Sequence, residues 1–151
     1  MMKKLLKAMM DSTSEVMETM FYFPVEFEEE SEFLNIAAMA EKEPCLACFI
    51  GFSGEFSGSF TLVMPENLLM EMAVNFLGEP EHRITHEHLT GTLTETLNMI
   101  CGNALTRFTD KEPFNLELPR ITSIPSGSEN DAFFLVRTPD SWMAINAAYE
   151  T

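Results

Sequence analysis

Residues 89–108, LTGTLTETLNMICGNALTRF, have the apolar spacing of an amphipathic helix. At about 100° per residue, the larger apolar side chains gather on one side of that helix. Glu95 and Asn98 fall on nearly the opposite side with Gly91 and Gly102, and as i,i+3 residues they are neighbours. The stretch therefore predicts a helix that buries one face and turns a carboxylate and an amide outward. The apolar set is Leu89, Leu93, Leu97, Ile100, Ala104 and Phe108.

The two glycines of this helix need an explanation, because each costs about 0.5–1 kcal/mol of helix stability relative to alanine. Gly91 lies one turn before Glu95, and Gly102 lies one turn after Asn98. Their missing side chains leave room on both sides of the polar pair, and Met99 adds an exposed apolar contact. Such a face suits the close approach of another macromolecule. An ordinary solvated helix face explains the same residues, and spacing alone leaves both interpretations open.

The rest of the chain predicts an α+β domain, spanning 1–151 as one unit, with a largely antiparallel sheet and long helices packed on it. The doubled F-S-G indicates a hairpin with a glycine turn. The acidic run at 26–32 is expected to be a solvated loop. The expected helices cover 3–21, 65–77 and the opening stretch with Thr85 as its N-cap. The expected strands cover 34–40, 45–64 around the glycine turn, 114–118, 121–124, 132–138 and 142–149.

The charge balance excludes two classes of partner. Lys and Arg together number 9 against 24 Asp and Glu, a formal net charge of −15. Nucleic acids and anionic membranes require basic surface, so neither is expected as a partner. The apolar run at the start, MMKKLLKAMMD, is interrupted by Lys7 and is too short for a signal peptide or a membrane span. We therefore expect a soluble, cytoplasmic protein with reduced cysteines.

Cysteine and histidine spacings give weak metal signals. Cys45 and Cys48 form a C-x-x-C, but the motif runs into a strand rather than the helix N-terminus that redox pairs use, and a three-residue offset on a strand turns the thiols to opposite faces. His82, His86 and His88 lack a clear carboxylate ligand at helical spacing. No metal site is predicted; buried small residues and exposed polar residues explain these positions better.

The motif Glu95-Thr-Leu-Asn98, continued by residues 99–104 as M-I-C-G-N-A, resembles the CheC/CheX/FliY family of bacterial chemotaxis phosphatases, most closely the CheX branch. The F-x-G-x-F hairpin, the following helix that ends in L-G, and Pro119 after FNLEL support the resemblance. It extends from the hairpin to the last strand, and it implies an α+β fold with long helices against an antiparallel sheet.

This resemblance implies dephosphorylation of a phosphorylated, CheY-like receiver domain. The family's glutamate pairs with the receiver's lysine and its asparagine orients the attacking water, roles that fall here to Glu95 and Asn98. Gly91, Met99 and Gly102 would then contact the partner. The resemblance further implies no cofactor bound by this chain, Mg²⁺ in the partner receiver, and a homodimer. Gly91 departs from the Asp or Ser of the CheC pattern, and the downstream proline is slightly closer than in that pattern.

Only one site per chain is expected, because the first helix carries no E-x-x-N. Two other functions stay open from the sequence. One is a non-catalytic module that docks a receiver or a motor or signalling component with the same helix face. The other is a ligand- or metal-binding domain that uses the histidines or cysteines. The cognate receiver and pathway are not encoded in these residues.

Overall fold

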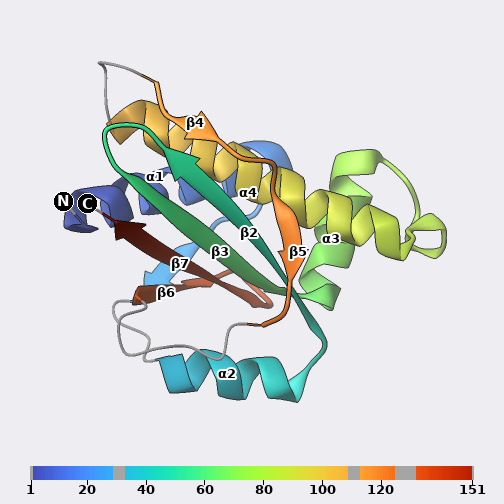
Figure 1. The fold of residues 1–151 in the computed structure, drawn as a ribbon. Helices are drawn as coiled ribbons and strands as arrows, with labels where there is room; N and C mark the ends of the chain where they lie inside the picture. Colours follow the sequence, from blue (N-terminus) through green and yellow to red (C-terminus); the bar gives the residue numbers. More distant parts are fainter. Residues whose placement is uncertain (1, 29–32, 109–112, 125–131, 151) are drawn as a thin grey trace.

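Three helices pack against one face of an antiparallel sheet in the computed structural model, which describes residues 2–28, 33–108, 113–124 and 132–150 (Figure 1). They are α1 (Met2–Phe21), α3 (Glu66–Leu77) and α4 (His86–Phe108), and a short helix, η1 (Glu81–Arg83), precedes α4. A further helix, α2 (Phe33–Lys42), contacts β6. The predicted α+β class with a largely antiparallel sheet and long helices is confirmed.

The described strands form a sheet in the order β1-β6-β7-β3-β2-β4, with β5 also pairing with β2. All the pairings are antiparallel, and the β2–β3 hairpin carries the predicted turn at Gly54. The strands are β1 (Glu26–Glu28), β2 (Cys45–Ser53), β3 (Ser57–Pro65), β4 (Asn115–Leu116), β5 (Arg120–Thr122), β6 (Ala132–Arg137) and β7 (Trp142–Glu150).

Alternation along the strands divides the apolar residues between two cores. Cys48, Ile50 and Phe52 of β2 face α1, α3 and α4 and join the main core. Ala47, one residue away, faces the opposite side with Val63 of β3 in a smaller core. The α2 residue Met39 packs against this smaller core, so α2 covers part of the sheet face that the other helices leave open.

Two sequence expectations are wrong. Residues 34–40 were expected as a strand and instead lie inside α2. Leucine, alanine and methionine are strong helix formers, and that preference prevails over the apparent alternation. The acidic run was expected to be a loop, but Glu26–Glu28 form β1 against β6, where Arg137 Nε donates to Glu28 Oε1 at 2.8 Å. The rest of that run lies outside the described residues.

Helix α1 ends on an unusual residue. Tyr22 has φ of 61°, in the left-handed region that favours glycine, and its side chain is 79% exposed. The Phe23 N–H donates to the Met17 carbonyl at 3.0 Å, so the chain folds back over the last turn of the helix directly after Tyr22. Tyr22 therefore occupies the glycine position of a helix C-cap and carries a strained backbone with few contacts to compensate.

Replacing Tyr22 with glycine should stabilise the protein. The Tyr22→Gly variant relieves the left-handed strain, and we expect its free energy of unfolding to rise by about 1 kcal/mol. Urea unfolding measures the change as a higher midpoint at an unchanged slope. Tyr22→Ala is the matched control: it removes the same ring but keeps a Cβ, so it should show no comparable gain. A Tyr22→Gly midpoint equal to that of Tyr22→Ala would contradict the strain argument.

Candidate functional site

Helix α4 begins where the sequence predicts, at a cap formed by Thr85. The Thr85 hydroxyl accepts from the His88 N–H at 3.2 Å, and His88 Nδ1 accepts from the Thr85 N–H at 3.0 Å. These reciprocal bonds satisfy two backbone donors at the helix start in the manner of a capping box, with histidine in the place of glutamate. His88 therefore acts at the helix cap.

One face of α4 is buried between the sheet and α1. Leu93, Leu97, Ile100 and Ala104 are fully buried, as the apolar spacing predicts. The helices α1 and α4 approach closely, and the Ser12 hydroxyl of α1 donates to the Ile100 carbonyl at 2.7 Å. This packing determines how α4 is rotated about its own axis, and hence which residues point away from the protein.

The opposite face carries the predicted polar pair. Gly91 and Glu95 are exposed, and Asn98 is half-buried. A Cβ placed on Gly91 would meet nothing within 4 Å, and one on Gly102 would lie 3.8 Å from Leu116 Cδ1. The surface around the pair is therefore open at Gly91, whereas Gly102 is half-buried beside Leu116.

Met99 differs from its expectation. It was expected as an exposed apolar contact, but the structure has it only partly exposed and packed against the main core. On the helical wheel it lies about 100° from Asn98, at the border between the outward and the buried faces. Its remaining exposed part still borders the polar pair.

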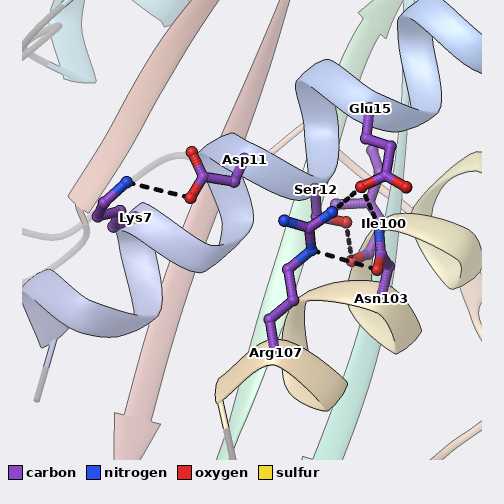
Figure 2. Close-up of polar contacts among 7 residues, drawn as sticks. All are labelled: Lys7, Asp11, Ser12, Glu15, Ile100, Asn103 and Arg107. Atoms are coloured by element: carbon purple, nitrogen blue, oxygen red, sulfur yellow. Dashed lines mark hydrogen bonds and ion pairs between the residues drawn. The ribbon is translucent and has the colours of Figure 1, made fainter.

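A second asparagine on α4 behaves differently. Figure 2 shows Asn103 beside Glu15 of α1 and Arg107 of α4. Asn103 Nδ2 donates to Glu15 Oε2 at 3.4 Å, Arg107 Nε donates to Asn103 Oδ1 at 3.3 Å, and Arg107 also pairs with Glu15. Asn98 makes no such bond with any residue that the structure describes. The amide of Asn103 is thus engaged in holding α4 to α1, and the amide of Asn98 is available to a partner.

The two cysteines of the C-x-x-C motif, Cys45 and Cys48, do not lie together. Cys45 packs against the smaller core and Cys48 belongs to the main core, so they face opposite sides of β2 as predicted. Burial raises the pKa of the Cys45 thiol to about 11, with a further contribution from Glu43, and burial raises that of Cys48 to about 12. Thiols with raised pKa values are poor nucleophiles and poor metal ligands at neutral pH.

Metal-binding constellations are not found in the described part of the chain: no three His, Cys, Asp or Glu residues there are grouped to hold an ion. The absence of a cofactor remains a prediction. Three hollows of the described surface are not lined by Glu95 or Asn98. One of about 570 Å³ lies between α2 and the β6–β7 turn, one of about 520 Å³ lies beside Leu77 and His88 at the start of α4, and one of about 460 Å³ lies over β2 and β3. The polar pair occupies the outer surface of a helix, which suits insertion into a partner.

Two features of this region could not be predicted from the sequence. The link from Glu15 through Asn103 to Arg107 joins residues 88 positions apart, and no local signal announces it. Strands were expected at 114–118 and 121–124, but their course beside α4 was not, because that course depends on pairing with β2 (Figure 1). No helix among the described residues has the length and apolar character needed to cross a bilayer.

A family model described as "Chemotaxis phosphatase CheX" matches residues 46–131, which include the β2–β3 hairpin and the whole of α4. A search of curated protein sequences finds no match. The family match therefore covers more than half of the chain and includes Glu95 and Asn98.

Solved structures share the fold at low sequence identity. The chemotaxis protein CheX from Vibrio vulnificus is 20% identical with a TM-score of 0.76, over 97% of this chain and 96% of that one. CheX from Borrelia burgdorferi, solved in a CheX–CheY–BeF₃–Mg²⁺ complex, is 18% identical with a TM-score of 0.69, over 97% of both chains. FliY from Thermotoga maritima is 15% identical with a TM-score of 0.60, over 92% and 83%.

The two glycines of α4 should limit stability. Nothing fills the space at Gly91, and a Cβ at Gly102 makes only ordinary contact with Leu116. We therefore expect Gly91→Ala and Gly102→Ala each to raise the free energy of unfolding by about 0.5–1 kcal/mol, measured by urea unfolding. If either variant is less stable than the parent, the position is sterically constrained and the clearance argument fails there.

Proposed function

Since the chain belongs to the CheX family of chemotaxis phosphatases, we propose that it removes the phosphoryl group from the phosphoaspartate of a CheY-type receiver domain. The observation that carries the proposal is the state of Asn98. Its amide lies on the outward face of α4 without a partner among the described residues, whereas Asn103 of the same helix is engaged by α1. An amide left free on a rigid helix is suited to entering a partner's site.

The proposed chemistry is hydrolysis by water. Asn98 can accept a hydrogen bond from the attacking water with its carbonyl and donate one to the phosphoryl group with its NH₂, and an amide does not titrate. The water oxygen forms a new bond to phosphorus as the bond from phosphorus to the aspartate oxygen breaks. The products are the receiver's free carboxylate, inorganic phosphate and a proton that passes to solvent. The contribution of Asn98 is orientation of the water relative to the phosphorus atom.

Glu95 has a separate role in this proposal. Its carboxylate lies one turn before Asn98 on the same face and is exposed, so it can form an ion pair with a lysine beside the phosphoaspartate. Such a pair orients the receiver and fixes the depth to which Asn98 enters. Mg²⁺ is carried by the receiver, and no cofactor is bound by this chain.

The identity of the partner rests on the family and on the Borrelia structure. That CheX was solved with CheY, beryllofluoride and Mg²⁺, which supports a CheY-type receiver as the partner here. Phosphorylation of the receiver and a homodimer of this chain are carried over as proposals from the resemblance. Sedimentation of the purified protein tests the dimer independently of activity.

The proposal predicts a loss of activity in Asn98→Ala. Removing one preorganised hydrogen-bonding group costs about 10²–10³ in rate, so the acceleration of phosphate loss from the receiver should fall by that order. The measurement is the decay of a ³²P-labelled CheY-type receiver at saturating phosphatase. Asn103→Ala is the matched control, because it removes the same amide from the same helix at a structural position. We expect this variant to retain catalysis, and its folding is verified separately.

Three outcomes separate the candidate functions. An Asn98→Ala variant that accelerates decay as well as the parent contradicts the catalytic assignment. If the parent chain binds only the phosphorylated receiver and leaves the lifetime of its phosphate unchanged, the chain is a non-catalytic docking module. The departure at Gly91, where the CheC pattern has Asp or Ser, would give a reason for that result. Glu95→Gln keeps the size of the side chain and removes its charge, and it should weaken receiver binding more than it slows the saturated rate.

A further inference from the structure

We propose that residues 114–122, which contain β4 and β5 and are called the strap below, form an apolar docking rim for the receiver domain beside Asn98. The proposal rests on the proposed function and adds a second contact surface to it. Its main contact residues are Leu118 and Ile121, which are 90% and 45% exposed. Leu118 is the most exposed of the large hydrophobic residues in the described part of the chain.

The course of the strap brings it past the polar pair. At one end, Leu116 Cδ1 lies 3.8 Å from the position of a Cβ on Gly102, one turn after Asn98. At the other end, Ile121 is paired with Cys48, whose thiol donates to the Leu93 carbonyl at 3.7 Å. The strap therefore runs antiparallel to α4 between the levels of residues 102 and 93. Along α4, Asn98 lies between residues 93 and 102, and along the strap, Leu118 lies between Leu116 and Ile121.

The strap is anchored to β2 by the pairing of β4 and β5 with that strand, and the side chains of Glu117 and Arg120 add further contacts. The Glu117 N–H donates to the Gly51 carbonyl at 2.9 Å, and its carboxylate covers Gly51 so closely that a Cβ there would collide with it. The Arg120 guanidinium lies 4.6 Å from the centroid of the Phe49 ring. Glu117 and Arg120 thus hold the outer face of the sheet, the face opposite to α4.

An aromatic cluster fixes the start of the strap. The ring of Phe114 lies 5.6 Å from that of Phe52, 5.1 Å from that of Phe56 and 6.3 Å from that of Phe108 at the end of α4. Such ring pairs add stability beyond the area they bury. Leu118 therefore projects from a segment held at both ends, and little conformational entropy is lost when a partner covers it.

A receiver that binds over Asn98 must also contact the strap, because protein interfaces are wide. A stable interface buries about 800 Å² on each partner, a patch far wider than one turn of helix. When Asn98 enters the receiver's site, the surface around that site must rest on what flanks the asparagine. On one flank stands the strap, with two exposed apolar residues that water solvates poorly. An apolar surface on the receiver next to its phosphoaspartate fits this rim.

Electrostatics favour an apolar contact here. The chain has a formal net charge of −15, so long-range attraction does not assist the approach of a receiver whose phosphorylated site is acidic. Short-range burial of apolar surface then has to supply affinity, and hot spots in interfaces are typically well-packed residues near the centre. The rim beside Asn98 is in the right place for that role.

The test measures binding and catalysis separately in the Leu118→Gln/Ile121→Gln double variant. The probe is a CheY-type receiver from the same organism, activated with beryllofluoride and Mg²⁺, and calorimetric titration measures its dissociation constant. We expect that constant to rise about tenfold or more, while the decay of the phosphorylated receiver at saturating phosphatase changes less than twofold. Leu118→Met keeps the apolar contact and should bind like the parent, and Tyr22→Asn removes an exposed aromatic outside the strap and should also bind normally.

Each result decides the proposal. Unchanged receiver binding by the double variant overturns it. Weaker binding that accompanies dissociation of a dimer in sedimentation also overturns it, because the strap would then be a contact between copies of this chain. Circular dichroism and thermal unfolding verify that both exposed substitutions leave the fold intact. If the parent itself neither binds the activated receiver nor accelerates its decay, the proposed function fails, a result distinct from failure of the strap alone.

Discussion

Burial of the apolar face of α4 between α1 and the sheet is the constraint on which the rest of the structure depends. Leu93, Leu97 and Ile100 are fully buried, and the bond from the Ser12 hydroxyl to the Ile100 carbonyl holds the two helices close together. Rotating α4 would expose these side chains at a cost of roughly 1.5–3 kcal/mol each. The outward direction of Glu95 and Asn98 is therefore a consequence of packing on the far side of the helix.

This constraint favours a function exercised on the surface of another protein. The polar pair stands on a rigid helix with open space at Gly91, and Glu95 and Asn98 line none of the three hollows described above. Glycine weakens the helix at the two positions that border the pair, so local stability is lower where close approach is needed. The same logic separates the two asparagines, since Asn103 holds α4 to α1 through Glu15 and Arg107.

The strap adds a second constraint that comes from the sheet. The strap is fixed by its pairing with β2 and by the aromatic cluster around Phe114, and it keeps the Leu118 side chain exposed to solvent beside the outward face of α4. Leu118 and Ile121 together expose apolar surface on one short segment, which suits contact with a partner. The helix supplies the polar groups of the proposed interface, and the strap supplies its apolar contact.

The sequence by itself determined the α+β class, the hairpin at Gly54, the helix cap at Thr85 and the outward pairing of Glu95 with Asn98, because each follows from local periodicity or turn chemistry. It misjudged 34–40, where helix propensity prevailed over alternation, and it overestimated the exposure of Met99 at the border of the buried face. Only the tertiary structure decided which asparagine is free and where Leu118 lies. Those answers depend on contacts such as Glu15 with Asn103 and β2 with β5, between residues far apart in the chain, and no local pattern encodes them.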